Sequence, residues 1–480
     1  MTATLRLHPL DAVSGMRRYL ILLAIPLVRG LTAIGDGWLV WLQGAWIDLA
    51  ALTAMLALGI LRWRQSRIFV TEGRMVYERG LFFHTRDVFF ADQISVFRVS
   101  RPWYLRPLHA VIIYPETMTQ ELKAFFPVIL HTGDLKIIER LFLQVRGERI
   151  QTIVRPRPSM VAAAAAASSD IVGGLTFAAA VLSNTARYAS EAAADTFLTA
   201  VFHTIRRLSF GLPPAVVIPL ATLLIAYLLA FLSSLSEYYR FTASRSAKML
   251  YLSGGLFTRC HFRVPVDKIE SVDLRYGLAS RWFAGVSVYV NASGLAAGTF
   301  APALIPAGSL MQTVRHLRRL LPELGSMACP IKVRPKDACQ RYLLGPLICL
   351  AASAAAGIVA AVLAPDMARL FAFWTVMLCA EVAWVAVHRL HAMFHSGVGV
   401  YETHLCLKYG KWFRYHRVMI PKDRIDRITV AQSAPQRAHG VCTLIVSETA
   451  RRRRRHIVRI VPYEPLTAAL KRAGYETWET

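Results

Sequence analysis

The chain has 480 residues, 55% of them hydrophobic, with a mean hydropathy of +0.40, which excludes an ordinary soluble protein. It carries 56 Lys and Arg against 30 Asp and Glu, so a net charge of +26 points to nucleic acid or an anionic membrane surface, and the hydropathy favours the membrane. The seven cysteines are odd in number and form no CxxC pair, which argues against a disulfide framework or a zinc site and fits a reducing compartment.

Along the chain, six apolar stretches follow one another in three pairs. Most approach the roughly 20 residues that a helix needs to span a bilayer. They cover residues 19–34, 38–61, 161–183, 212–235, 342–363 and 370–387. Arg17 and Arg18 precede the first stretch, and no clear cleavage site follows, which predicts an anchor and not a removed signal peptide. The sequence thus predicts six transmembrane helices in three hairpins.

Basic residues flank these hairpins on one side. The flanking arginines are Arg17, Arg18, Arg62, Arg64, Arg67, Arg155, Arg157, Arg240, Arg245, Arg334, Arg341 and Arg389. The predicted tips at residues 35–37 and 364–369 are short and carry little positive charge. By the positive-inside rule, both termini and the segments between the hairpins are cytoplasmic. The middle tip, 184–211, is longer and contains Arg206 and Arg207; its residues 192–208 read either as a helix on the outer surface or as a solvated loop.

A β-rich pattern follows each hairpin, beginning near Glu78, Leu252 and Leu407, and its alternation of apolar and polar residues predicts antiparallel strands. Several positions align among the three copies: Gly80, Gly255 and Gly410; Asp92, Asp267 and Asp423; Ile94, Ile269 and Ile425; Arg106, Arg281 and Arg437; Val111, Val286 and Val441. Each copy ends in one more strand (125–130, 299–305, 457–461) and a helix (135–145, 310–321, 465–473). We therefore predict hairpins at 8–67, 157–239 and 335–392, and β-rich domains at 68–150, 240–324 and 393–476.

A curved antiparallel sheet closed at one end by an amphipathic helix is the plan of a pleckstrin-homology (PH) barrel. The Gly-containing hairpin, the Pro265-x-Asp267-x-Ile269 segment with its counterpart from Pro421, and Arg281-x-x-x-Gly285 before a strand resemble the membrane-associated bacterial PH-domain family (type 2). The alternation of hairpins and three domains is similar to its YdbT-like members. The resemblance implies an α+β integral membrane protein of the bacterial inner membrane, with three PH-like antiparallel β-barrels, each following a transmembrane hairpin. It supplies no shared catalytic residues.

Basic loops are the candidate ligand-binding features. PH-type barrels bind lipid headgroups with basic loops at one open end, and each basic residue near an anionic surface contributes about 1 kcal/mol. The candidates are Arg451, Arg452, Arg453, Arg454 and Arg455 in one hairpin, Arg259, Arg263 and Lys268 in the second domain, and Arg414, Arg417, Lys422 and Arg424 in the third. A solvated turn or an exposed sheet face is the alternative for each set. No aromatic stacking platform accompanies them, so a nucleic-acid partner is not predicted.

Four ionisable residues fall within the apolar stretches: Arg29, Asp48, Asp170 and Glu381. Charges at membrane depth suggest a function, although Arg29 and Asp48 can also pair within one hairpin. His388, His391 and His395 recur at helical spacing, which allows metal binding, but no Asp, Glu or Cys lies near except Glu381, and juxtamembrane basic residues are the interpretation we adopt.

No GxSxG, HExxH, P-loop or Rossmann fingerprint occurs. We therefore expect a non-enzymatic protein without a cofactor or metal, whose cytoplasmic domains form a lipid-surface or protein-docking platform in envelope maintenance or stress tolerance. Its expected partners are anionic lipids and, by the resemblance, a smaller membrane PH-domain protein of the same family. The alternative is transport or channel function through the six-helix bundle, using Asp48, Asp170 or Glu381.

Overall fold

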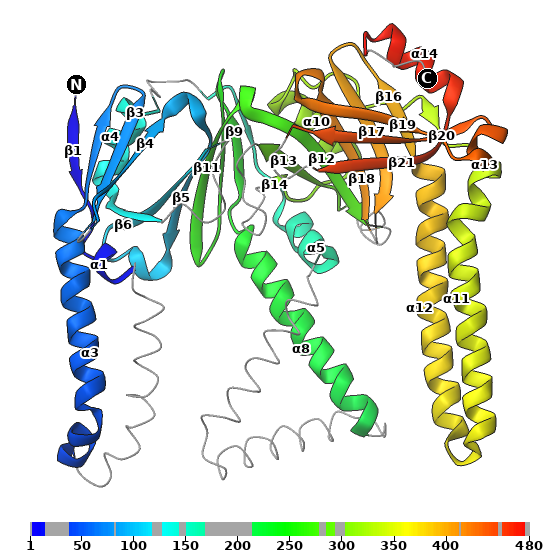
Figure 1. The fold of residues 1–480 in the computed structure, drawn as a ribbon, viewed down its shortest axis with the longest axis horizontal. Helices are drawn as coiled ribbons and strands as arrows, with labels where there is room; N and C mark the ends of the chain where they lie inside the picture. Colours follow the sequence, from blue (N-terminus) through cyan, green and yellow to red (C-terminus); the bar gives the residue numbers. More distant parts are fainter. Residues whose placement is uncertain are drawn as a thin grey trace. The chain divides into compact units, whose positions relative to one another are not determined.

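The structure is a computed structural model that describes residues 2–14, 38–80, 83–117, 127–143, 150–168, 214–277, 285–292, 303–411, 414–449 and 454–475 (Figure 1). The predicted first apolar stretch, most of the third and the middle tip lie outside these residues. The chain divides into two compact units. One comprises Met1–Gln151, Ser168–Thr242 and Tyr251–Arg263, and the other comprises Thr152–Ala167, Ala243–Leu250 and Val264–Thr480.

The first repeat builds two antiparallel sheets and a closing helix. The first sheet has the order β1 (Ala3–Arg6), β2 (Arg67–Thr71), β3 (Arg74–Arg79), β4 (Thr85–Phe90). In the second, β6 (Ala110–Thr117) lies between β5 (Ile94–Pro102) and β7 (Val128–His131). Helix α4 (Thr132–Leu141) follows directly, as the sequence predicts.

The core of this repeat lies between its two sheets and the helix. Ile68 and Phe89 come from the first sheet, Phe97 and Leu130 from the second, and Ile138 from α4, and all five are buried. Because alternate residues of a strand point to one face, the period-2 pattern of the sequence directs these side chains inward. The repeat is therefore a two-sheet β-structure capped by a helix, as expected for a PH-like barrel.

The second repeat contributes its elements in the same order. Strand β8 (Thr152–Val154) pairs with β9 (Thr242–Arg245). Then come β10 (Met249–Gly254), β11 (Thr258–Pro265), β12 (Ile269–Gly277), β13 (Ser287–Ala292), β14 (Ala303–Ile305) and helix α10 (Leu310–Leu320). Ser309 caps α10, because its side chain accepts a hydrogen bond from the backbone N–H of Gln312, at 3.3 Å. Leu317 and Leu320 on α10 and Leu321 after it are buried, whereas Leu310 at the start of the helix is 47% exposed.

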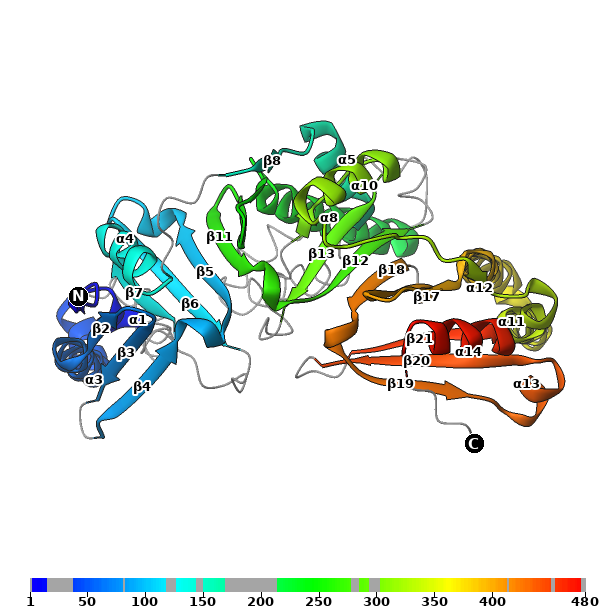
Figure 2. The same ribbon diagram turned by 90° about the horizontal axis from the view of Figure 1, so that it is seen from above.

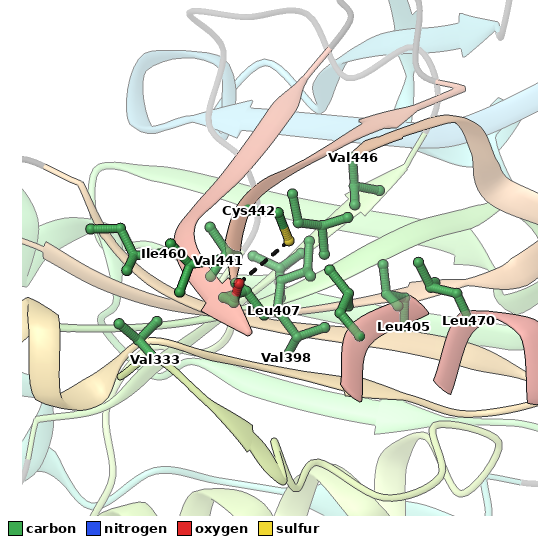
Figure 3. Packing of buried hydrophobic residues seen from close by; sticks show 14 of the residues in the cluster. Val333, Val398, Leu405, Leu407, Val441, Cys442, Val446, Ile460 and Leu470 are labelled. Carbon is green, nitrogen blue, oxygen red and sulfur yellow. Dashed lines mark hydrogen bonds between the residues drawn. The ribbon is translucent and has the colours of Figure 1, made fainter. Parts of the chain in front are cut away.

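The third repeat again forms two sheets around an apolar core (Figure 3). Its strands are β15 (Ile331–Lys332), β16 (Gly397–Val400), β17 (His404–Lys411), β18 (Arg414–Pro421), β19 (Ile425–Ala431), β20 (Val441–Glu448) and β21 (Arg455–Pro462), with the short helix α13 (Ala434–Ala438) and the closing helix α14 (Tyr463–Arg472). Leu405 and Leu407 of the first sheet meet Val446 of the second and Leu470 of α14 in this core. The Cys442 thiol donates to the Val461 carbonyl at 3.4 Å, so it packs as a small core side chain.

Each helical insert enters its domain between the first and second strands. In the first repeat, α1 (Asp11–Ser14) and α3 (Trp38–Gln65) lie between β1 and β2. In the second, α5 (Pro158–Ser168) and α8 (Pro214–Glu237) lie between β8 and β9, and in the third, α11 (Pro335–Leu363) and α12 (Ala368–His395) lie between β15 and β16. The domain borders predicted at residues 68, 240 and 393 therefore omit the first strand of each barrel.

Two helical segments in the described part of the chain are long and apolar enough to cross a membrane. They are Tyr342–Leu363 and Phe371–His395, and they belong to the adjacent antiparallel helices α11 and α12 (Figure 1). These are the two spans predicted for the third hairpin. The described residues thus support two of the six predicted spans.

Consecutive repeats are joined edge to edge. Within the first unit, β5 of the first repeat pairs antiparallel with β11 of the second. Within the second unit, β12 of the second repeat pairs antiparallel with β18 of the third, which gives one sheet of order β14-β13-β12-β18-β17-β16-β15 (Figure 2).

Candidate anion-binding site

A pocket of about 500 Å³ lies where the third hairpin meets its barrel. Its walls come from four elements, with Tyr342 from α11, residues 385–392 of α12, Tyr409–Lys411 of β17 and alternate residues of β21. On α12, the lining residues Val385, His388, Arg389 and Ala392 share one helical face because they are three or four positions apart.

Four cations line the pocket: Arg389, Lys411, Arg455 and Arg459. Arg455 and Arg459 flank Ile457 on the outward face of β21, where every second residue is exposed. All four cationic side chains are exposed, and none forms an ion pair within the described part of the chain. None of the described residues that line the pocket is a carboxylate, so the described lining carries net positive charge.

The rest of the lining is apolar or aromatic. Val385, Ala392 and Ile457 supply aliphatic surface, and the rings of Tyr342 and Tyr409 complete the walls. Gly410 permits the close approach, because a Cβ on this residue would lie 2.5 Å from the Cβ of Ala392. A positive rim over an apolar lining suits a ligand that has both a negative head and a hydrophobic part.

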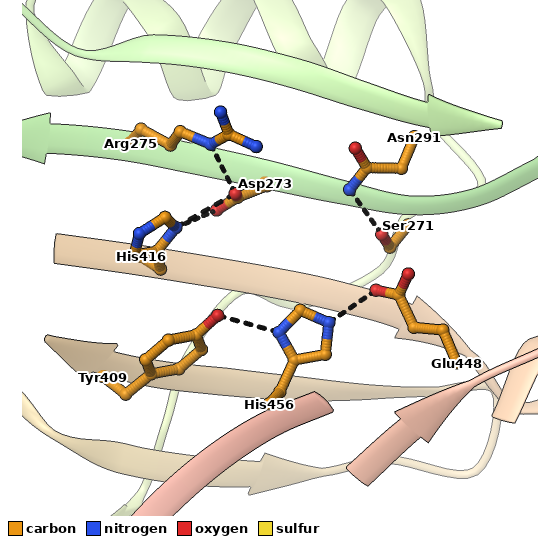
Figure 4. A network of polar contacts seen from close by, with 8 residues as sticks. All are labelled: Ser271, Asp273, Arg275, Asn291, Tyr409, His416, Glu448 and His456. Atoms are coloured by element: carbon orange, nitrogen blue, oxygen red, sulfur yellow. Dashed lines mark hydrogen bonds and ion pairs between the residues drawn. The ribbon is translucent and has the colours of Figure 1, made fainter. Parts of the chain in front are cut away.

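A buried series of polar contacts holds Tyr409 in place (Figure 4). The Tyr409 hydroxyl is 2.8 Å from Nδ1 of His456, and Nε2 of His456 is 2.7 Å from Oε1 of the fully buried Glu448. The Tyr409 ring also stacks on His416, with ring centroids 5.2 Å apart. These contacts connect β17 with β18, β20 and β21, so they fix one wall of the pocket.

This Tyr–His–Glu series does not prepare a nucleophile. Burial raises the pKa of Tyr409, and the charges of Asp273 and Glu448 raise it further, so the phenol keeps its proton at neutral pH. A hydroxyl that stays protonated and is already hydrogen-bonded serves to hold structure.

A second buried group lies at the β12–β18 junction (Figure 4). Nδ1 of His416 is 3.0 Å from Oδ2 of Asp273, and Nε of Arg275 donates to the same oxygen at 2.6 Å. Burial alone disfavours the charged carboxylate, but His416 and Arg275 together outweigh burial and lower the pKa of Asp273. The group therefore joins β12 of the second repeat to β18 of the third.

The predicted basic candidates are dispersed in the structure. Among the described candidates, only Arg455 lines the pocket, while Arg451, Arg452 and Arg453 lie outside the described residues. Others are already engaged: Arg263 pairs with Glu139, Lys268 with Asp267, and Arg424 with Asp423.

Lys422 is engaged by the end of its own domain. Its ammonium donates to the carbonyls of Ala473 and Gly474 at 2.9 and 3.1 Å, which places a cation at the C-terminal end of α14. Arg259 and Arg414 are exposed near the starts of β11 and β18, and Arg417 is half-buried on β18.

Of the predicted intramembrane charges, Glu381 lies exposed on α12. Asp48 belongs to α3, while Arg29 and Asp170 lie outside the described residues. The rings of His391 and His395 stack with their centroids 3.8 Å apart, and the His388 ring stacks on Tyr415. Within the described ranges, no group of His, Cys, Asp and Glu side chains has metal-binding geometry.

Sequence reasoning missed three of the four pocket cations as ligand candidates. Arg389 entered only as a flanking charge, and Lys411 and Arg459 did not enter at all. The signal for Arg459 was present, since it stands two residues beyond Ile457 and four beyond Arg455 on one strand face. The approach of α12 to β17 carries no such signal, because it joins segments that are distant in sequence.

Comparison with known proteins identifies one family. The family model of the bacterial PH domain matches residues 21–141, 196–321 and 346–472. Each match begins within one helical insert and continues through the strands and the closing helix that follow it, and no curated protein matches the chain. PH-like domains are general modules for docking proteins and lipids. The chain belongs to the bacterial PH domain family and carries three copies of the domain.

Proposed function

We propose that this protein is a multi-pass inner-membrane docking protein without catalytic activity, and that the pocket of its third PH-like domain holds the phosphate headgroup of an anionic phospholipid. The observation that carries the proposal is the set of four cations at the end of the two apolar helices, none of which pairs with a described carboxylate. Basic pockets beside the cytoplasmic ends of membrane helices suit phosphorylated headgroups.

The surfaces of α11 and α12 support the membrane part of this proposal. Leu347, Ile358, Val362 and Val376 are more than half exposed, although water disfavours such side chains. A helix that is apolar all round needs either a protein core or a bilayer around it. Acyl chains would cover these side chains, and the pocket would then lie at the depth of the headgroups.

The pocket chemistry favours a lipid over a free inorganic anion. Guanidinium and ammonium groups form strong charge-assisted hydrogen bonds with phosphate oxygens. The aliphatic and aromatic walls provide a matching surface for the glycerol and upper acyl carbons of a phospholipid. Binding of this kind would hold the barrel against the bilayer surface.

The test is a titration of the full-length protein in mild detergent with phosphatidylglycerol, read by native mass spectrometry. Lys411, Arg455 and Arg459 are changed together to Gln. Each cation near an anionic surface contributes up to about 1 kcal/mol, less where salt screens it. The variant should therefore bind the lipid roughly tenfold to a hundredfold more weakly.

The matched control removes three arginines from the exposed face of α10: Arg315, Arg318 and Arg319. It lowers the net charge equally but leaves the pocket intact, so its affinity should stay near that of the unchanged protein. Equal losses in both variants would show a general charge effect and refute a headgroup pocket. Equal binding of zwitterionic phosphatidylethanolamine would also refute it.

A role in envelope maintenance or stress tolerance, and a smaller PH-domain membrane protein as partner, belong to the same proposal. The transport alternative gains no support from the described residues. Glu381 lies exposed on α12 and is not among the described residues that line the pocket.

A further inference from the structure

The two junctions between repeats pair equivalent strands of the repeats, and they do so in the same register. At the first, Arg263 of β11 lies opposite Phe97 of β5, and at the second, Met419 of β18 lies opposite Val272 of β12. Aligning the repeats on Asp92, Asp267 and Asp423 makes these two pairs equivalent. A register shift of one residue would turn every side chain to the other face, so the agreement defines one recurring interface.

Each end of the chain leaves one half of this interface without a strand partner. Strand β4 is the first repeat's counterpart of β11 and β18, and β19 is the third repeat's counterpart of β5 and β12. Among the described strands, β4 pairs only with β3, and β19 only with β20. Figure 2 shows both at the edges of their sheets.

Burial at the central position of the interface reflects this difference. Phe97, Val272 and Met419 are 0% exposed where two repeats meet. Their counterpart on β4, Val88, is 43% exposed, and their counterpart on β19, Ile428, is only half-buried. The apolar residue on each edge is thus less buried than Phe97, Val272 and Met419 are at the internal junctions.

A groove runs along β19. It has a volume of about 1050 Å³ and is lined on one side by β19 and on the other by α14, including Thr467, Ala468 and Lys471. In the first repeat, the incoming strand β11 contacts the corresponding helix, because Arg263 pairs with Glu139 of α4. Glu139 on α4 and Thr467 on α14 occupy equivalent positions, because each directly follows a buried residue of its helix, Ile138 and Leu466 respectively. The groove therefore corresponds to a place that a neighbouring repeat occupies at the internal junction.

An arginine supplies an independent sign of a missing neighbour. Arg106, after β5, donates to the carbonyls of Leu256 and Phe257, at 2.5 and 3.2 Å, in the turn that leads into β11. Its aligned counterpart in the third repeat is Arg437, which is exposed at the groove. The Arg437 guanidinium has no hydrogen-bond or ion-pair partner within the described ranges.

We propose that β4 of a second copy of this chain pairs antiparallel with β19 in this groove and continues the recurring interface between molecules. The register places Val88 of one copy opposite Ile428 of the other, and Arg86 opposite Val430. Arg427 then lies diagonally across from Asp87, on the same face and with opposite charge. Since every copy carries one edge of each kind, assembly is head-to-tail, in rings or filaments.

Disulfide trapping in native membranes tests both the partner and the register. One tagged chain carries Val88→Cys, and a second chain with a different tag carries Ile428→Cys. Directly opposed residues of antiparallel strands have Cα atoms about 4.5 to 5.5 Å apart, which a disulfide can bridge. Mild oxidation should give a reducible band that contains both tags, and Arg86→Cys with Val430→Cys should give the same band.

The control pairs Val88→Cys with Thr429→Cys, which moves the second thiol one residue along β19 and onto its other face. The native cysteines are identical in all pairs, so they cannot produce a difference between them. Equal crosslinking in both pairs, or none in a correctly inserted and folded chain, overturns the proposal. Two further outcomes would overturn the assignment of a second copy as the partner. One is an intramolecular disulfide in a single chain that carries both Val88→Cys and Ile428→Cys. The other is a crosslink from Val88→Cys to a different protein and not to the second tagged chain.

Discussion

At the scale of single residues, Asp273 carries much of the junction between the second and third repeats. Its carboxylate is almost fully buried and is held between His416 and Arg275. Sequence alone shows only an Asp in an otherwise alternating strand. Its partner His416 lies in another repeat, so no local pattern predicts the pair.

Replacing Asp273 with Asn should weaken this junction. The change leaves Arg275 and His416 without the charge they bind, and breaking a buried ion pair from one side costs about 3–5 kcal/mol. Hydrogen exchange of β12 and β18 should accelerate at neutral pH. Asp423→Asn, at a carboxylate that is 70% exposed, should leave exchange in these strands unchanged.

The pH dependence has a definite sign. Because the pKa of Asp273 is lower in the folded protein than in the unfolded chain, its contribution to stability is complete above the unfolded pKa of about 3.9 and is lost as the pH falls through the folded pKa. The unchanged protein and the Asn variant should therefore converge in acid. A difference that grows below pH 4 would contradict this account.

At the scale of elements, local pattern predicts much of each repeat. The predicted closing strands overlap β7, β14 and β21, and the predicted closing helices overlap α4, α10 and α14. The two apolar stretches of the third insert lie within α11 and α12. The aligned glycines have different causes: Gly80 and Gly255 have positive φ, at +155° and +113°, whereas Gly410 admits Ala392 of α12. The first strands were missed because they have two to four residues and pair across long inserts.

The first strand can be tested directly. Leu5 on β1 is buried in the core of the first repeat although about sixty residues separate it from Ile68, its partner on β2. Leu5→Ala should destabilise that repeat by about 2–5 kcal/mol, the usual cost of removing a buried leucine side chain. Faster hydrogen exchange in β2 and β3 would show the loss. Thr4→Ala, at an exposed position of the same strand, should have little effect, and equal exchange in both variants would place β1 outside the core.

At the scale of the whole molecule, the insertion of helices between paired strands constrains the membrane topology. Arg6 pairs with Arg67, Val154 with Ala243, and Lys332 with Gly397. Each insert therefore leaves and re-enters the same sheet, so the two ends of any insert that crosses a membrane must lie on the same side of it. Helices that cross must then come in even numbers within each insert. This rule does not depend on hydropathy, and the six spans proposed from the sequence satisfy it.

The resulting prediction concerns which residues are reached from outside the cell. Asp366, in the turn between α11 and α12, should react in intact cells after substitution by Cys, with a membrane-impermeant thiol reagent. Cysteines replacing Glu72 and Asp423, in the first and third barrels, should react only after the membrane is opened. The unsubstituted chain reports the background from its own cysteines. Labelling of one barrel but not the other in intact cells would place the two barrels on opposite sides of the membrane. That topology requires an odd number of crossings between the barrels. It would contradict the insertion of every helical segment between neighbouring strands, because a bilayer cannot separate paired strands.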